Sequence, residues 1–419
     1  MADAFDVVVV GGGPVGACVA ALLAAAPHRQ AHPLTVAVLE PHRPAHPAEG
    51  APPDLRVAAF SRASERIFDT AGAWSTIVAG RTSAYERMRI WHESVAVNDR
   101  RALLFDAAEA GEPNLGYIIE TRAVQTALLD AAVAAGVRIY ASEFVSLKIA
   151  ADGVHIDTAG ESLSARLVVG ADGARSPVRE AFGLAAAVSG YGQVAIVATV
   201  ATARAHERTA WQRFLSTGTL AFLPLADGTS SIVWSADEKV AGPLLAATPQ
   251  EFAGELERAS DGALGTIELR SERLSFALQR LSAAHYVTER CALVGDAAHV
   301  VHPLAGQGVN LGLLDAAALA QLVRAAVDEG EDPGALRVLR RYERWRKSET
   351  ELMRFAIDAF DRLLAHGAGP MAQLAQRGLG WVNRNSELKR LFMSRALGLS
   401  GELPLAAQRA QFDRSSLHR

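Results

Sequence analysis

Three acidic residues in this chain of 419 residues each follow a short apolar run, and two of them adjoin glycine. They are Glu40, Asp172 with Gly173 after it, and Asp296 with Gly295 before it. An acid at the carboxyl end of a strand can accept hydrogen bonds from the hydroxyl groups of a ligand such as a ribose. A glycine-rich turn before a helix presents backbone N–H groups to an anion. The pattern therefore predicts a site for a ligand that is both hydroxylated and anionic.

The most informative glycine turn lies near the start of the chain. It follows the β-branched run Phe5–Val10 (FDVVVV), which is typical of a strand buried on both faces. The turn has the spacing G-x-G-x-x-G, formed by Gly11, Gly13 and Gly16 with Pro14 between them. The first glycine permits a tight turn, the second lets a pyrophosphate approach the backbone, and the third lets the next helix pack on the strand. Because a second strand, Leu34 to Leu39, then ends in Glu40, the whole unit predicts dinucleotide binding rather than a structural turn.

A second stretch of this kind runs from Cys291 to Ala320. A short buried strand ending at Val294 delivers Gly295 and Asp296, and a turn rich in glycine and proline follows. A long helix of alanine and leucine is expected to begin near Asn310. We expect the acid to hold hydroxyl groups and the helix N-terminus to face an anionic group.

The remaining elements predict a mixed α/β fold in which an antiparallel sheet is inserted into the dinucleotide-binding unit. Residues 193–235 contain short strands rich in Val, Thr, Trp and Phe, separated by turn residues, as in a sheet with one buried face. A helix is expected from Ser61, its N-cap, to about Ala71, with Gly72 after it. The dinucleotide-binding domain is predicted in two parts, residues 1–185 and residues 286–335, and the first part is interrupted by short substrate-domain strands near 85–120. Residues 186–285 are predicted to form a β-sheet substrate domain. Residues 336–419 are predicted to form a helical C-terminal region.

Composition and charge limit the partners of the protein. The formal net charge of −4 argues against a general nucleic-acid binder. The segment from Arg337 to Arg419 is nevertheless basic, with 16 Lys and Arg against 8 Asp and Glu. This segment is either a solvated helical face, which we favour, or a surface for membrane contact. Both cysteines lie in apolar runs, no basic segment precedes the first apolar run, and the longest apolar run is too short for a membrane span. We expect a cytoplasmic protein, with the inner face of the membrane as a peripheral contact surface.

The motifs resemble those of the class A FAD-dependent aromatic hydroxylases, which carry three fingerprints. The matching residues are the glycine motif with Glu40, Asp172–Gly173 and Gly295–Asp296. Within that class, the run HPLAGQGVNLG from His302 to Gly312, followed by Asp315, is similar to the signature of ubiquinone-biosynthesis hydroxylases of the UbiH/UbiF/UbiI type. The resemblance covers nearly the whole chain, including residues 54–57 (DLRV), 116–120 (GYIIE), 221–225 (AFLPL), 232–235 (IVWS) and 396–399 (ALGL).

This resemblance implies a fold like that of p-hydroxybenzoate hydroxylase, with a Rossmann-like FAD-binding domain, an inserted antiparallel substrate domain and a helical C-terminus. It implies bound FAD, NAD(P)H and O₂ as co-substrates, and hydroxylation of the aromatic ring of a polyprenylated phenol or benzoquinol in ubiquinone biosynthesis. The FAD-binding residues that it implies are Gly11, Gly13, Pro14, Gly16, Glu40, Arg56, Arg122, Gln125, Asp172, Gly173, Gly295, Asp296, Pro303, Gly306, Gln307, Gly308, Val309 and Asn310.

Some of these roles are more specific. Spacing alone leaves Arg56 equally compatible with a surface salt bridge and a phosphate contact, and the resemblance places it against phosphate or flavin. The resemblance also places Asp296 against the ribityl chain. It implies that the backbone N–H groups of Val309 and Asn310 face the flavin ring.

No catalytic side chain is identified, because the flavin itself carries the chemistry. His299 and His302, beside Pro303, could act as bases, but we favour a structural role in shaping the flavin loop. They lack acid or thiol partners at ligand spacing, so no metal site is expected. Four aromatic residues of the predicted sheet are either sheet core, which we favour, or part of the substrate pocket: Trp211, Phe214, Phe222 and Trp234.

Two other functions fit the same motifs. One is a related flavoprotein that reduces a prenyl lipid rather than hydroxylating it. The other is a flavin-bound scaffold subunit of a quinone-biosynthesis complex with little turnover of its own. The intact fingerprints favour an enzyme over a scaffold.

Overall fold

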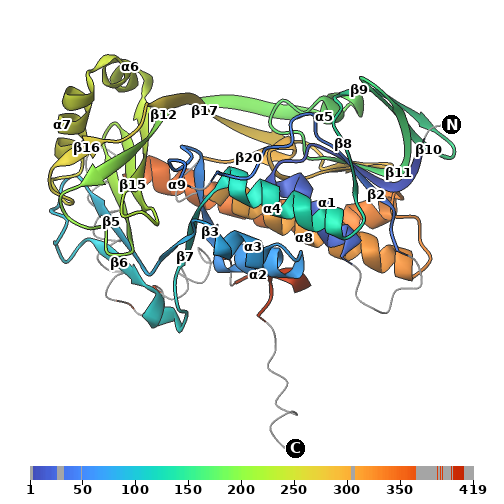
Figure 1. Ribbon diagram of the computed structural model, residues 1–419, viewed down its shortest axis with the longest axis horizontal. Coiled ribbons are helices and arrows are strands. Elements are labelled where there is room, and N and C mark those ends of the chain that lie inside the picture. The colour runs from blue at the N-terminus through green and yellow to red at the C-terminus, as the bar shows by residue number, and fades with distance from the viewer. Residues whose placement is uncertain are drawn as a thin grey trace, which may run out of the picture.

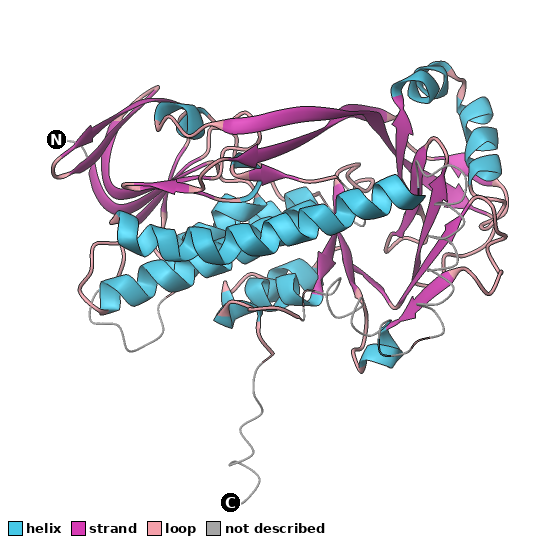
Figure 2. Cartoon of the chain, turned by 180° about the vertical axis from the view of Figure 1, so that it is seen from behind, coloured by secondary structure: helices cyan, strands magenta, loops and turns pink. Residues whose placement is uncertain are grey.

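Two large β-sheets occupy the two ends of the long axis of the molecule, as the computed structural model shows (Figure 1). The structure describes residues 3–25, 33–48, 50–302, 307–364, 385, 387, 389, 398 and 400–409. The long strands β12 (Ala186–Thr202) and β17 (Leu274–Ala283) run between the two ends on one side. Helices α1 (Pro14–Ala24), α4 (Thr121–Ala134), α8 (Gln307–Asp328) and α9 (Leu336–Leu364) lie on the other side, as the reverse view also shows (Figure 2).

The first sheet is Rossmann-like, with a parallel centre formed by β19, β11, β1, β2 and β8. Its strands have the order β18-β19-β11-β1-β2-β8, with the hairpin β9–β10 paired to β11. The bounds are β1 (Asp3–Val10), β2 (Val36–Leu39), β8 (Arg138–Tyr140), β9 (Phe144–Ala150), β10 (Gly153–Thr158), β11 (Ser162–Gly170), β18 (Val287–Thr288) and β19 (Cys291–Leu293). In the parallel register, Val10 lies beside Leu39 and Gly170, and Gly170 lies beside Leu293. The carboxyl ends of four strands are therefore level, so the turns that follow them gather at one edge.

The second sheet is antiparallel apart from one pair, since β13 runs parallel to β5. It has the order β20-β17-β12-β15-β14-β13-β5-β6, with β16 paired to β12. The further bounds are β5 (Arg87–His92), β6 (Leu103–Asp106), β13 (Thr209–Leu215), β14 (Gly218–Pro224), β15 (Ser230–Asp237), β16 (Ile267–Leu269) and β20 (His299–Val300). Helices α6 (Glu238–Ala246) and α7 (Pro249–Ala259) cover one face, where Phe222, Trp234 and Phe252 form a core. The other face is directed towards the rest of the molecule.

Smaller elements join the two sheets. A three-stranded sheet has the order β3-β7-β4, made of β3 (Val57–Ser61), β4 (Ser83–Tyr85) and β7 (Gly116–Glu120). The short helices are α2 (Arg62–Thr70), α3 (Trp74–Ala79), α5 (Pro177–Ala181) and the 3₁₀ turns η1 (Ala107–Ala110), η2 (Gly295–Ala297) and η4 (Leu405–Ala407).

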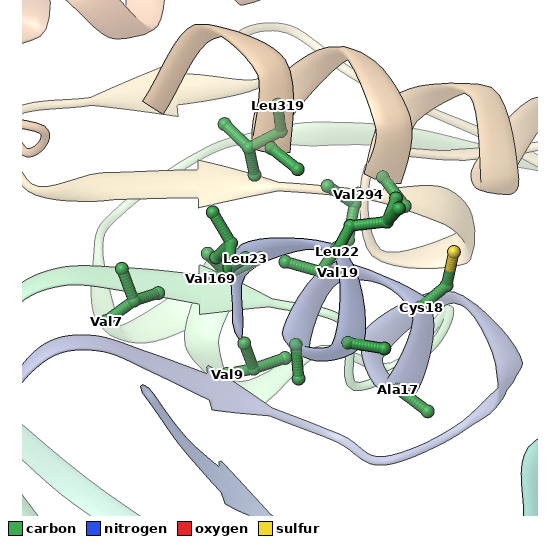
Figure 3. Close-up of a cluster of buried hydrophobic side chains, with 14 of the residues drawn as sticks. Val7, Val9, Ala17, Cys18, Val19, Leu22, Leu23, Val169, Val294 and Leu319 are labelled. Carbon is green, nitrogen blue, oxygen red and sulfur yellow. The ribbon is translucent and has the colours of Figure 1, made fainter. Parts of the chain in front are cut away.

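The main core lies between the parallel sheet and its helices. Figure 3 shows Val19, Leu22 and Leu23 of α1 in this core. Strand residues such as Val9 lie on one side of them, and Leu319 of α8 lies on the other. By length and composition, α8 residues Gly308–Asp328 are the one described helix that could cross a membrane. Most of this helix is buried in the protein, and its place in the core accounts for its apolar composition.

The local predictions agree with these elements, with shifted ends. The helix predicted after Ser61 is α2, and Ser61 Oγ accepts a hydrogen bond from Ser64 N at 3.2 Å. Gly72 follows it with φ +75°, a conformation that favours glycine. The second strand begins at Val36 rather than Leu34, and α8 begins at Gln307, three residues before the predicted start. The predicted helical C-terminal region, residues 336–419, lies outside the described residues from 365 to 399, apart from residues 385, 387, 389 and 398.

Candidate cofactor and substrate site

The glycine turn after β1 is closely packed at two of its three motif positions. Gly11 has φ +98°, and a Cβ there would lie 2.4 Å from the carbonyl oxygen of Ala171. A Cβ on Gly16 would lie 1.9 Å from the carbonyl oxygen of Gly11. Gly13 is different: it caps the N-terminus of α1, lines a cavity, and would bring a Cβ to within 4 Å of no neighbouring group. The first and third glycines therefore serve packing, and the second leaves the start of α1 open to a ligand.

Side chains from two other elements hold this turn. Glu40 accepts hydrogen bonds from Gly12 N (2.8 Å) and His42 N (3.0 Å), one at each carboxylate oxygen. Gln125 of α4 donates a hydrogen bond from Nε2 to the carbonyl oxygen of Gly12 at 2.9 Å. The peptide groups of the turn are thus fixed from both sides. Each carboxylate oxygen of Glu40 keeps capacity to accept a further hydrogen bond.

Asp172 lies in the turn after β11. Its Oδ2 accepts a hydrogen bond from Val178 N at 2.9 Å in the first turn of α5. Its Oδ1 is buried and has no hydrogen-bond partner among the described residues, and burial raises the pKa of this carboxyl. Gly173 and Ala171 line the cavity next to it. The observed role of Asp172 is therefore to support α5 and the turn beside Gly11.

The turn after β19 packs against the first turn of α1. Gly295 has φ +57°, and a Cβ on Gly312 would lie 2.7 Å from a methyl group of Val15. This close approach brings η2, α1 and α8 together. The carboxyl of Asp296 is exposed to the cavity. The surrounding protein restricts its hydration and raises its pKa, while the charge of His299 opposes this shift.

The start of α8 is anchored by Asn310, which is buried. Asn310 Oδ1 accepts hydrogen bonds from Ser61 N (2.9 Å) and Ser64 Oγ (2.6 Å), and Nδ2 donates to the carbonyl oxygen of Ala59 (2.8 Å). Gly308 and Val309 line the cavity beside it. The predicted site residues Pro303 and Gly306 lie outside the described residues, as does the side chain of Gln307.

The two predicted arginines differ in their contacts. Arg56 is exposed and lines the cavity, and its guanidinium has no ion pair or hydrogen bond to any described residue. Its carbonyl oxygen accepts hydrogen bonds from Thr121 N (2.9 Å) and Thr121 Oγ1 (2.8 Å), which fix this segment to α4. Arg122 instead faces Asp54, with Nε 3.4 Å from Oδ2. The surface salt bridge considered for Arg56 is absent within the described part of the chain.

Sequence reasoning missed a buried charged group behind the turn that carries Asp296. Asp315 of α8 lies 2.5 Å from His299 Nε2 and accepts a hydrogen bond from Arg346 Nε of α9 at 2.8 Å. It also accepts one from Gly295 N at 3.2 Å. Burial acts to raise the pKa of Asp315, but the charges of His299 and Arg346 outweigh it and lower the pKa. Asp315 was visible only as part of a motif, and Arg346 gave no signal among the other arginines of its helix.

His302 lies shortly after β20 and lines the cavity. Its Nε2 lies 2.9 Å from Gln193 Oε1, and its ring packs edge-on against Tyr191 at 4.9 Å. Both partners belong to β12, so His302 holds the segment that follows β20 against β12. In the described ranges, no group of three or more His, Cys, Asp or Glu residues is arranged to hold a metal ion.

A cavity of about 820 Å³ connects all of these turns to the antiparallel sheet. The sheet wall is lined mainly by small and apolar side chains, and these include Val197, Ala221, Leu223, Val233, Leu274 and Phe276. Two of the larger aromatic residues alternate to the other face. Phe222 and Trp234 belong to the core under α6 and α7, and Phe214 packs against Val301 and Leu311. Only Trp211 of the four predicted aromatic candidates lies in the cavity wall, and its ring packs against Trp91 at 6.2 Å.

The residues at this edge fit a flavin dinucleotide. The open position at Gly13 and the first turn of α1 suit a pyrophosphate, and Glu40 lies where an adenosine ribose would follow. Asp296 and the start of α8 border the same cavity farther along, next to the sheet wall. One continuous space therefore runs from the pyrophosphate position at Gly13 to Asp296 and the sheet wall, and it leaves room for a second, apolar ligand beside the cofactor.

Comparison with known proteins agrees with this geometry. Residues 4–353 match the family model described as "FAD binding domain". The crystal structure of p-nitrophenol 4-monooxygenase from Pseudomonas putida superposes with a TM-score of 0.75 at 21% identity, covering 96% of this chain and 100% of that one. The fold and the site thus define an FAD-binding protein with the fold of the flavoprotein monooxygenases, and the predicted p-hydroxybenzoate hydroxylase-like fold and FAD cofactor are confirmed.

The curated relatives narrow the class. The chain is 38% identical to the ubiquinone hydroxylase UbiL of Rhodospirillum rubrum, over 94% of this chain and 89% of that protein. It is 33% identical to the 3-demethoxyubiquinol 3-hydroxylase of Escherichia coli, over 94% of this chain and 98% of that protein. The chain belongs to the family of FAD-dependent hydroxylases of ubiquinone biosynthesis.

Proposed function

We propose that this protein hydroxylates the aromatic ring of a polyprenylated phenol or benzoquinol intermediate of ubiquinone biosynthesis. The observation that carries the proposal is the single cavity that joins the three dinucleotide-binding turns to an apolar sheet wall. The names of the two relatives, a ubiquinone hydroxylase and a demethoxyubiquinol hydroxylase, support the same substrate class. Bound FAD would supply the redox chemistry, taking electrons from NAD(P)H and activating O₂.

The cofactor is assigned to the residues at the level strand ends. Gly11, Gly13 and Gly16 with the start of α1 would seat the pyrophosphate, and Glu40 would hold the adenosine ribose. Arg56 is a cation at the cavity wall without an ion-pair partner among the described residues, and it would contact phosphate or flavin. Gln125 would act indirectly, because its side chain positions the glycine turn.

The residues near the flavin ring have distinct tasks. Asp296 would bind the ribityl hydroxyl groups with its cavity-facing carboxyl. The N–H groups at the start of α8, expected at Val309 and Asn310 and joined by Gly308 because the helix begins at Gln307, would stabilise negative charge on the flavin ring. A helix N-terminus carries a positive partial charge. The apolar wall opposite would exclude water from the reacting ring. His299 would shape this turn through Asp315 rather than act as a base.

The apolar end of the cavity suits a prenyl tail. Leu274 and Phe276 of β17 line the cavity and are 41% and 50% exposed, so they form an apolar opening to the surface. A polyprenyl substrate resides in the bilayer, and we therefore infer that this opening and the basic C-terminal segment face the inner surface of the membrane. Alternatively, the same segment would bind other quinone-biosynthesis proteins, and the experiment below distinguishes the two partners.

Assays on purified protein distinguish the hydroxylase from the two other functions, a prenyl-lipid reductase and a flavin-bound scaffold. We expect one FAD per chain, and NAD(P)H oxidation with O₂ uptake and a product heavier by one oxygen atom when a short-tail prenylated phenol is added. NAD(P)H oxidation that yields a hydrogenated tail without O₂ uptake would instead identify a reductase. A flavin-loaded protein with neither activity, whose Asp296→Ala variant still supports quinone synthesis in a deletion strain, would identify a scaffold. Co-sedimentation with anionic vesicles tests the membrane contact, and retention only with partner proteins would favour the complex.

A further inference from the structure

The antiparallel sheet carries one cavity-facing row of residues in which two hydroxyl groups lie between aromatic rings. The backbone register pairs Phe276 with Ala195, Ala195 with Ser235, Ser235 with Thr219, and Thr219 with Phe214. The row thus crosses five neighbouring strands, and Phe276, Ser235 and Thr219 line the cavity. The next row, two residues along, contains only Leu274, Val197, Val233, Ala221 and Gln212.

The hydroxyl of Thr219 is buried without a partner among the described residues, as is that of Ser231, which also lines the cavity. Thr219 is 6% exposed, and no described residue lies within hydrogen-bond distance of its Oγ1. Ser235, directly opposite, is 4% exposed. A buried hydroxyl without a hydrogen bond is destabilising, so such groups normally have a partner. Since both residues line the cavity, a bound ligand can supply the partner.

These hydroxyls lie near the residues that precede α8 and begin it. Phe214, next to Thr219 in the row, belongs to one buried cluster with Val301 and Leu311. On the other flank, Gln193 is two residues before Ala195 on β12 and contacts His302, which also lines the cavity. A ring held by Thr219 and Ser235 would therefore lie beside the residues that border the flavin.

The charges around the cavity indicate which substituents can be recognised here. Among the described lining residues, the charged ones are Arg56 and Asp296, and both lie on the cofactor side. The sheet contributes hydroxyls, one amide and apolar groups. A carboxylate placed on this wall would be desolvated without a cation beside it, which is strongly unfavourable. The wall fits an uncharged hydroxyl or methoxy group.

We propose that Thr219 and Ser235 bind an uncharged oxygen substituent of the substrate ring, an inference that rests on the proposed function. By holding this oxygen, the two residues set which ring carbon faces the flavin. The apolar row beside them then accommodates the ring face and the start of the tail. Phe276, at the end of the hydroxyl row, is half exposed and separates this polar spot from the surface.

The test compares binding of three rings to the FAD-loaded enzyme, measured by quenching of flavin fluorescence. The probes are a short-tail prenylated phenol, its methyl ether, and the analogue without the ring oxygen. We expect the wild type to bind the phenol roughly tenfold more tightly than the deoxy analogue, as for one or two buried hydrogen bonds. Thr219→Val, which keeps the side-chain shape, and Ser235→Ala should each reduce this preference to about twofold or less.

Ser230→Ala is the matched control. Ser230 lies on the same strand as Ser235 and also has a buried hydroxyl without a described partner, but it faces away from the cavity. It should keep the wild-type preference. Under turnover, Thr219→Val should also release more H₂O₂ per NAD(P)H consumed, with a changed ratio of hydroxylated isomers.

The proposal would be overturned if Thr219→Val and Ser235→Ala both kept the wild-type preference for the phenol over the deoxy analogue. It would also be overturned if Ser230→Ala lost this preference to the same extent. Loss of FAD or of a cooperative thermal transition in both variants would assign the hydroxyls to structure and overturn it as well. Failure of the proposed function looks different, because the wild type would then form no hydroxylated product from any of the rings. Because the binding preferences are measured without turnover, they do not depend on whether the enzyme forms a hydroxylated product.

Discussion

His299 Nε2 lies 2.5 Å from Asp315 Oδ2, and this contact joins the turn that carries Asp296 to the first half of α8. Arg346 binds the other carboxylate oxygen from α9, so three segments far apart in the sequence share one buried charge. The turn and the helix that border the flavin side of the cavity are therefore held by electrostatics as well as by packing.

Removing the charge of Asp315 should destabilise the fold and weaken FAD binding. Asp315→Asn leaves His299 and Arg346 buried without their anion, and such a change typically costs about 3–5 kcal/mol of unfolding free energy. Urea unfolding and FAD titration measure the two effects. The control is Glu268→Gln, which breaks an exposed pair with Arg270 and should change stability by about 1 kcal/mol or less. Equal effects of the two substitutions would show that the buried cluster is unimportant.

The same carboxylate predicts a loss of stability in acid. The folded protein lowers the pKa of Asp315, so its contribution is present above the unfolded pKa and is lost as pH falls through the folded pKa. The difference in unfolding free energy between wild type and Asp315→Asn should hold from pH 7 to about pH 4 and shrink below it. Urea unfolding across this range checks the sign, and a difference that grows in acid would contradict it.

Unlike Asp315, Asp296 should destabilise the apoprotein through its charge and yet be needed for FAD binding. Its pKa is raised, so the charged carboxylate opposes folding at neutral pH in the protein without cofactor. Asp296→Asn should therefore raise the melting temperature of the apoprotein at pH 7 and weaken FAD binding by roughly tenfold or more. Differential scanning fluorimetry with and without FAD separates the two effects. A lower melting temperature of the apo variant would contradict this account.

Two alanine substitutions in the glycine turn should fail in different ways. Gly16→Ala places a methyl group 1.9 Å from a carbonyl oxygen of the same turn, so the apoprotein should lose about 1–3 kcal/mol or more of stability. Gly13→Ala meets no neighbouring group within 4 Å and should leave the melting temperature of the apoprotein unchanged, while roughly tenfold or more of the FAD affinity is lost. If Gly13→Ala binds FAD normally, the pyrophosphate does not lie against this position.

Adjacent residues on β14 should separate the two faces of the antiparallel sheet. Ala221→Leu extends into the cavity and should raise KM for the aromatic substrate severalfold without changing FAD binding. Phe222→Leu, on the face under α6 and α7, should instead lower stability by about 1 kcal/mol and leave KM unchanged. Steady-state kinetics and thermal unfolding of both variants provide the comparison. Reversed effects would mean that the opposite face binds substrate.

Much of the cofactor site could be predicted because its signals are local. The turn at Gly11–Gly16, the acid at Glu40 and the capped helix after Ser61 depend on backbone geometry within a few residues, which residue type and spacing encode directly. The fold class followed, since β-branched runs alternating with helices and a separate set of short strands indicate distinct sheets. Family membership followed from the motif that ends at Asp315.

The tertiary structure decided the arrangement of groups that are distant in sequence. Alternation along β14 and β15 predicts two faces, but only the position of α6 and α7 shows that Phe222 and Trp234 are core and that Ala221 and Val233 face the cavity. Likewise, the sequence by itself determined that acids end three strands. The common register of those strands, the pairing of Asp315 with Arg346 and the opposition of Thr219 to Ser235 come from long-range packing, which no local pattern encodes.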